Sequence, residues 1–135
     1  MIIDHIGIAC KNLEASAKKY LMLGFEAKNP LAIEDLERNC KYLFMENKGY
    51  MIELIAILDK NKPSDLGNLL INETFGQKIY HVCYKSSDLF ADIERLCGDG
   101  FKLIHPPRAA VACENREVAF LYNIDLGLIE LIEEA

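Results

Sequence analysis

The chain repeats itself once at an offset of 76 residues, and this repeat constrains the fold more than any other feature of the sequence. Residues 2–9 (Ile-Ile-Asp-His-Ile-Gly-Ile-Ala) return as residues 78–84 (Lys-Ile-Tyr-His-Val-Cys-Tyr), and later positions match at the same offset. The matched pairs are His5 and His81, Leu13 and Leu89, Ala15 and Ala91, Gly24 and Gly100, Phe25 and Phe101, Pro30 and Pro106, and Phe44 and Phe120. An internal repeat indicates one structural unit used twice, so we expect two related halves.

Each copy predicts a strand followed by an amphipathic helix. The apolar residues fall at i, i+4, i+7 and i+8, the stripe of a helix face; they are Leu13, Ala17, Tyr20 and Leu21 in the first copy and Leu89, Ile93, Leu96 and Cys97 in the second. Asn12 and Ser87 are the predicted N-caps, and Gly24 and Gly100 follow the two helices.

Three strands are expected after each helix. In the first copy they are 25–28, 40–46 and 50–58, while residues 31–38 are polar and ambiguous. In the second copy they are 101–104, ended by Pro106-Pro107, then 117–122 and 126–132, a closing hairpin. The segment 59–77 is polar and contains Pro63 and Gly76, with a short helix possible after Ser64.

The predicted fold class is therefore α+β, built from two βαβββ modules in a single domain, 1–135. Module 1 covers residues 1–58, the connector 59–77, and module 2 78–135. A unit of this size has one apolar sheet face that it cannot cover alone, so two units must pair, within one chain or between two chains.

Composition excludes several classes of function. The net charge of −6 argues against a nucleic-acid surface, and no apolar run reaches the roughly 18 residues of a membrane span. No signal peptide is visible. The five cysteines form no CxxC pair, which predicts five buried free thiols in a reducing compartment, the cytoplasm.

Two histidines and two glutamates stand at equivalent places in the repeat. His5 and His81 lie in the first strand of each module, and Glu53 and Glu130 lie within aliphatic last strands. A buried carboxylate normally has a cation partner. A single histidine in a strand usually has a structural role, and a single glutamate in an apolar strand usually faces outward. Here a histidine and a glutamate recur together at equivalent places of the two repeats. This recurrence favours one divalent ion held by all four residues. Mixed nitrogen and oxygen ligation suits Zn, Ni, Co, Mn or Fe better than calcium.

The sequence also resembles a known superfamily, the vicinal-oxygen-chelate proteins, which include glyoxalase I, methylmalonyl-CoA epimerase, extradiol dioxygenases and antibiotic-resistance proteins. The resemblance covers nearly the whole chain and is closest to methylmalonyl-CoA epimerase and glyoxalase I. The residues that carry the resemblance are Ile3 to Ala9, Leu13-Glu14-Ala15, Tyr20, Leu23-Gly24-Phe25, Ile52-Glu53-Leu54, Tyr80-His81-Val82, Val118 to Leu121, and Gly127 to Leu131.

This resemblance implies a curved mixed sheet that forms a cup around a divalent metal ion (Zn, Ni, Co or Mn). The positions matching His5, Glu53, His81 and Glu130 would supply the ligands. The implied chemistry is removal of a proton next to a carbonyl, and for this step we expect Glu130 to be the base and Glu53 the opposing acid or base. Arg108, Arg116 and Arg38 are candidates for binding an anionic substrate tail.

Three functions remain open on the sequence. The first is a metal-dependent isomerase acting on an acyl-CoA such as methylmalonyl-CoA, and the second is a glyoxalase I-type lyase (lactoylglutathione lyase) acting on a thiol conjugate. The third is a small-molecule binding or resistance protein, against which the complete set of charged residues inside strands counts. The expected partner, besides the substrate, is a second copy of the chain in a homodimer, with no nucleic acid or membrane.

Overall fold

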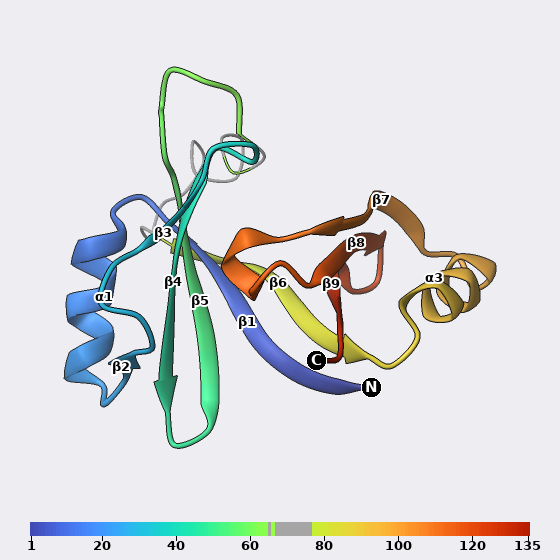
Figure 1. Cartoon of the computed structure of the whole chain (residues 1–135), viewed down its shortest axis with the longest axis horizontal. Coiled ribbons are helices and arrows are strands. Elements are labelled where there is room, and N and C mark those ends of the chain that lie inside the picture. Colours follow the sequence, from blue (N-terminus) through green and yellow to red (C-terminus); the bar gives the residue numbers. More distant parts are fainter. Residues whose placement is uncertain (65, 67–76) are drawn as a thin grey trace. The chain divides into compact units, whose positions relative to one another are not determined.

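Two strands, β1 (Ile2–Cys10) and β6 (Gln77–Ser86), open the two repeats at the predicted places. The computed structural model describes residues 1–64, 66 and 77–135. Within this part the chain divides into two units, Ile6–Tyr80 and Met1–His5 together with His81–Ala135 (Figure 1). We call them the N-terminal unit and the C-terminal unit. The first five residues, including His5, therefore belong with the second half of the chain.

The N-terminal unit follows the predicted order with one additional strand. After β1 come α1 (Leu13–Met22), β2 (Glu26–Ala27), β3 (Ile33–Asp35), β4 (Cys40–Asn47) and β5 (Tyr50–Ile57). The strands lie in the order β2-β4-β5-β1, and β3 also pairs with β4. β1 and β5 are parallel, and the other pairs are antiparallel. The ambiguous residues 31–38 thus contain the short strand β3, which the sequence did not predict.

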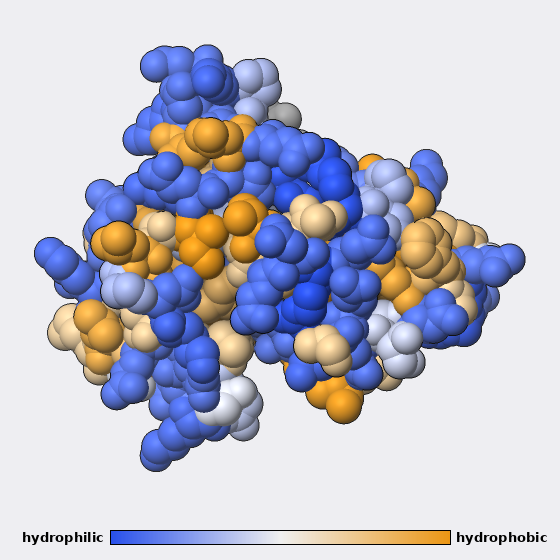
Figure 2. Space-filling model, in the orientation of Figure 1, coloured by the Kyte–Doolittle hydropathy of each residue, from blue (hydrophilic) through white to orange (hydrophobic). Residues whose placement is uncertain are grey.

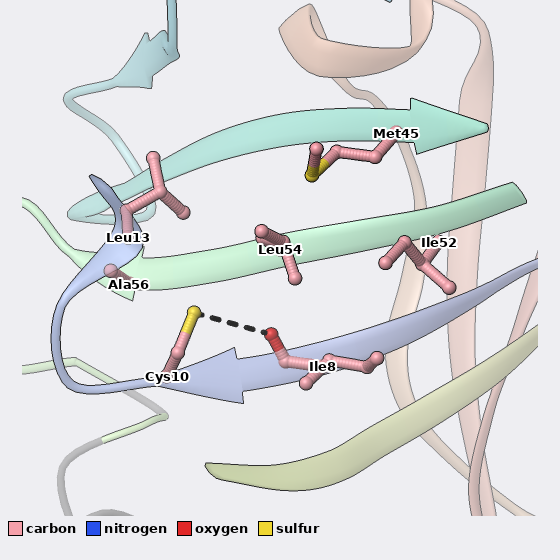
Figure 3. Close-up of a cluster of buried hydrophobic side chains, with 7 residues drawn as sticks. All are labelled: Ile8, Cys10, Leu13, Met45, Ile52, Leu54 and Ala56. Carbon is pink, nitrogen blue, oxygen red and sulfur yellow. Dashed lines mark hydrogen bonds between the residues drawn. The ribbon is translucent and has the colours of Figure 1, made fainter. Parts of the chain in front are cut away.

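The core of the N-terminal unit lies between its sheet and α1. Figure 3 shows side chains from β1, β4 and β5 directed toward one another beside the start of α1; the residues are Ile8, Cys10, Leu13, Met45, Ile52, Leu54 and Ala56. Asn12 caps α1 as predicted, because its side chain accepts a hydrogen bond of 2.9 Å from the Ala15 N–H. Gly24 follows the helix at φ +95°, a conformation that favours glycine.

The C-terminal unit has the same arrangement. After β6 come α3 (Leu89–Gly98), β7 (Lys102–Ala109), the short helix η1 (Val111–Cys113), β8 (Glu117–Asn123) and β9 (Gly127–Glu133). The strand order is β6-β9-β8-β7, with β6 and β9 parallel and the other pairs antiparallel. A second core packs α3 against one face of this sheet; it contains Leu89, Ile93, Ala119, Leu121, Ile129 and Leu131. The predicted α+β fold of two βαβββ modules is confirmed.

Several details differ from the prediction. Asp88, not Ser87, caps α3, since its carboxylate accepts from the Ala91 N–H at 3.0 Å. The stripe residues Leu21 and Cys97 are exposed; each lies in the last turn of its helix. All five cysteines are free, and the other four are buried as expected.

β7 runs through Pro106-Pro107 instead of ending before them. Within the C-terminal unit it is an edge strand that pairs with β8 alone, and an edge strand can place a residue without an N–H donor on its unpaired side or at a bulge. The register shifts between His105 and Arg108, where the prolines lie. The helix predicted after Ser64 falls mostly on residues outside the described ranges.

The surface mixes polar side chains with separate apolar patches, as Figure 2 shows for one face. Among the exposed apolar residues are Met22, Leu31, Leu36, Tyr50 and Ile124. None of the described helices is long and apolar enough to cross a membrane.

Leucine 54 provides a test of the N-terminal core. Its side chain is fully buried, whereas Leu21 is 54% exposed. We expect Leu54→Ala to lower the free energy of unfolding by about 2–5 kcal/mol, because it leaves a cavity. The matched control Leu21→Ala should change it by less than about 0.5 kcal/mol. Urea denaturation followed by circular dichroism measures both, and equal effects would contradict this core.

Candidate metal centre

Three donor atoms of the C-terminal unit face one another inside the protein. His5 Nε2 lies 3.3 Å from Glu130 Oε1, and His81 Nε2 lies 3.4 Å from the same oxygen. The two Nε2 atoms are 3.4 Å apart. The three residues come from β1, β6 and β9 and are between 1% and 5% exposed. The atoms thus form a nearly equilateral triangle in a buried place.

Asp4 fixes the orientation of His5. Asp4 Oδ2 lies 2.7 Å from His5 Nδ1, so a proton on Nδ1 is donated to the carboxylate and the lone pair of Nε2 points toward the triangle. The hydrogen bond with His5 holds the pKa of Asp4 below its ordinary value, against the opposing effect of partial burial. Lys85 Nζ, at 3.8 Å from Asp4 Oδ1, adds a positive charge on the outer side.

The electrostatics of Glu130 depend on the two histidines. Complete burial alone would raise the pKa of this carboxyl, but the neighbouring His81 and His5 outweigh burial and lower it. Among the described residues, Oε1 has no partner that meets hydrogen-bond geometry. A buried, ionised oxygen in this position requires a cation, which protonated imidazoles or a metal ion can provide.

The spacing of the three atoms fits a metal ion. Zinc-type ions bind histidine nitrogen and carboxylate oxygen at about 2.0–2.2 Å, so neighbouring ligand atoms in a tetrahedral site are about 3.3 Å apart. The observed separations of 3.3–3.4 Å match this value. The Asp4–His5 contact is also the carboxylate–histidine pair that commonly supports a metal ligand. These residues therefore fit the divalent ion that the superfamily implies.

A second group of donors lies beside the triangle. Asp4, His5 and Cys83 each place one ligand atom within 4.8 Å of the others. However, Asp4 and His5 already bind each other, and burial raises the pKa of the Cys83 thiol, which keeps it protonated at neutral pH. We therefore assign Asp4 and Cys83 to the surroundings of the triangle.

Glu53 occupies the equivalent position in the N-terminal unit. It is 3% exposed and lies between Gly7 of β1 and Phe44 of β4 in the sheet register. Glu130 lies in the same way between Cys83 of β6 and Phe120 of β8. The structural repeat therefore matches Glu53 with Glu130, although their separation in sequence exceeds the common offset by one residue.

The three arginines named from the sequence differ in their surroundings. Arg38 forms an ion pair with Asp35 at 3.1 Å. Arg116 donates to the backbone carbonyls of Cys113 and Glu133, which ties η1 to β9, and its role in substrate binding stays a prediction. Arg108 is exposed on β7.

Sequence reasoning missed two features near the triangle. Asp4 was overlooked because neighbouring residues in a strand point to opposite faces, yet its short carboxylate reaches the His5 ring. His105 follows the strand predicted over 101–104, but it lies within β7 and pairs with Phe120. The sequence signal for a strand that includes His105 is the run of strand-forming residues before Pro106.

Two βαβββ modules, each with a histidine on its first strand and a glutamate on its last, define a vicinal-oxygen-chelate protein. The family model of the Glyoxalase/Bleomycin resistance protein/Dioxygenase superfamily matches residues 4–120, and the chain belongs to this superfamily.

The similar proteins include several epimerases. An ethylmalonyl-CoA/methylmalonyl-CoA epimerase from Cereibacter sphaeroides is 29% identical over 132 residues, which are 96% of this chain and 95% of that protein. The crystal structure of methylmalonyl-CoA epimerase from Mycobacterium tuberculosis superposes with a TM-score of 0.81 at 27% identity, covering 98% of this chain and 87% of that one. A Streptomyces coelicolor methylmalonyl-CoA epimerase variant in complex with 2-nitronate-propionyl-CoA has a TM-score of 0.81 at 24% identity, covering 100% and 98%.

The contact between Asp4 and His5 predicts a measurable effect on metal binding. Asp4→Ala should weaken the affinity for Co²⁺ or Zn²⁺ by roughly 10–100-fold, because His5 loses the partner that orients it. Asp4→Asn should retain most of the affinity, since the amide oxygen still accepts the Nδ1 proton. Competition with a chromophoric chelator measures the affinity, and Asp125→Ala, in an exposed turn, is the control. Unchanged affinity in Asp4→Ala would show that Asp4 does not position His5.

Proposed function

We propose that the protein is a divalent-metal-dependent epimerase of acyl-CoA thioesters that carry a carboxyl group on the α-carbon, such as methylmalonyl-CoA or ethylmalonyl-CoA. The names of the similar proteins include these substrates. An epimerase of this kind must remove a proton from a carbon next to a carbonyl and return one to the opposite face.

The observation that carries the proposal is the buried triangle of His5 Nε2, His81 Nε2 and Glu130 Oε1. A purely structural sheet does not require such a group, because burying an ionised carboxylate without a cation lowers stability. A chain that had kept the fold but lost the chemistry would be more stable with apolar residues at these positions.

We assign His5, Glu53, His81 and Glu130 as the residues that hold the ion, with Asp4 orienting His5. When bound, a divalent ion supplies a Lewis acid that polarises a substrate carbonyl. Two neutral imidazoles and two carboxylates balance its charge of two. Glu53 pairs with Gly7 on β1, the strand that also carries His5, which supports this set.

The two glutamates carry out the proton transfer. Glu130 takes the α-proton with the carboxylate oxygen that does not face the histidines, and the electron pair of the broken C–H bond moves into the neighbouring carbonyl. Glu53, its counterpart from the other module, starts this step protonated by solvent, delivers that proton to the opposite face of the same carbon and ends as a carboxylate. In the reverse direction the two residues exchange roles.

The exposed cation Arg108 is suited to the anionic tail of the coenzyme A group. It lies on the edge strand β7, and an exposed guanidinium binds phosphate in two-point contacts. The expectations of a homodimer and of the cytoplasm stay predictions.

Isotope exchange tests these assignments. With Co²⁺, Mn²⁺, Ni²⁺ or Zn²⁺ bound, the protein should exchange the α-proton of both methylmalonyl-CoA epimers in deuterium oxide. Glu130→Gln should abolish exchange from one epimer and Glu53→Gln from the other, because an amide oxygen can still face the ion but cannot accept the proton. Both should lower the epimerisation rate by roughly 10²–10⁴-fold. Proton NMR follows the exchange.

The control is Glu94→Gln on the exposed side of α3, which should leave the rates unchanged. If neither epimer exchanges while methylglyoxal–glutathione is converted, the protein is a lyase of the glyoxalase type and the epimerase proposal is wrong. If Glu130→Gln and His81→Ala alter neither metal content nor activity, the site assignment is wrong.

A further inference from the structure

One face of the sheet in the C-terminal unit is covered by α3, and the other carries the donor triangle. Ala119, Leu121, Ile129 and Leu131 pack against α3. Side chains alternate between the faces of a strand, so Phe120 and Glu130 point to the opposite side. We call that side the donor face.

The strand register places His105 in the same row as Glu130. On the donor face Glu130 pairs with Phe120, and Phe120 pairs with His105 on the edge strand β7. Paired residues project to the same side of a sheet. Because neighbouring strands are about 4.8 Å apart, the backbone of His105 lies about 10 Å from that of Glu130.

Ring contacts connect this row to the triangle. The ring of Phe120 is 5.3 Å from that of His81 and 5.8 Å from that of His105, and both contacts are edge-to-face. Edge-to-face packing at such distances is favourable, so Phe120 holds the His105 ring at a defined place. Exposure increases outward along the row: Glu130 is buried, Phe120 is half-buried and His105 is exposed.

A residue two strands from Glu130 is too far away to touch groups bound at the triangle. A longer substrate that extends along this row from the triangle would meet Phe120 first and His105 next. In the proposed substrates the extending part is the chain beyond the thioester sulfur, in which short alkyl segments alternate with amides. A half-buried phenyl ring matches the alkyl segments, and an exposed imidazole can donate to, or accept from, an amide.

We propose that Phe120 and His105 form a subsite for the amide-containing arm attached to the thioester sulfur, with His105 forming a hydrogen bond to the first amide. This subsite rests on the proposed function, because it assumes a thioester reacting at the triangle. It adds a specificity-determining residue that the metal chemistry does not require. His105 selects substrates by the amide-containing arm beyond the sulfur, whereas the four metal-binding residues act on the acyl group.

Two truncated substrates test the subsite. The N-acetylcysteamine thioester of methylmalonate contains the first amide, and the S-methyl thioester lacks it. His105→Phe should lower kcat/KM for the first by roughly tenfold, the effect of one lost hydrogen bond, and leave kcat/KM for the second unchanged. His105→Gln should restore most of the loss, because its amide can form the same bond.

The matched control is Lys102→Ala, an exposed position on the same edge strand, paired with Tyr122, two residues from Phe120 along β8. It should affect neither thioester, since neither carries a phosphate. Equal losses for both thioesters in His105→Phe, or the same loss in Lys102→Ala, would overturn the subsite.

A binding measurement separates failure of the subsite from failure of the proposed function. The protein has three histidines, so their imidazole NMR signals can be assigned with single variants. Titration with pantetheine, which has the arm but no acyl head, should shift the His105 signal and leave His5 in place. This shift would support the subsite even for a protein that epimerises nothing, and its absence would overturn the subsite even in an active epimerase.

Discussion

The structure of the site depends on one costly interaction, the burial of the Glu130 carboxylate between two imidazole rings. A carboxylate removed from water is stable only beside positive charge, which the two rings provide when protonated or through an ion that they hold. His5 and His81 are therefore not interchangeable with apolar residues of similar size. The aliphatic residues around Glu130 pack the sheet, but they also lower the local dielectric constant and so strengthen every charge–charge contact within it. The same packing that excludes water makes the pairing necessary.

The repeat explains how much of this arrangement could be predicted from the sequence. An offset of 76 residues links His5 with His81, and strands of alternating side chains put each glutamate inside its sheet. Fold class, element order and the His–Glu pairs follow from these two rules. The structure then confirms that Glu53 and Glu130 have the same register neighbours, glycine or cysteine on one side and phenylalanine on the other.

The features that could not be predicted depend on the folded structure and not on local sequence patterns. The role of Asp4 depends on a side chain reaching around its own backbone, which no periodicity reports. The continuation of β7 through two prolines depends on that strand lying at an edge, a property of the folded sheet and not of the residues themselves. The cap at Asp88 in place of Ser87 is a shift by one residue, the usual uncertainty at helix ends.

The position of His5 also has a consequence for how the site is made. His5 emerges from the ribosome 76 residues before His81, while β6 and β9, which carry its partners, are still to be synthesised. The N-terminal unit can pack its core during this interval, because its helix and strands β2 to β5 follow β1 directly. The donor triangle can form only after β9 has been translated, through contacts distant in sequence that are slow to form. All residues of the N-terminal core are therefore synthesised before the chain has any ability to retain a metal ion.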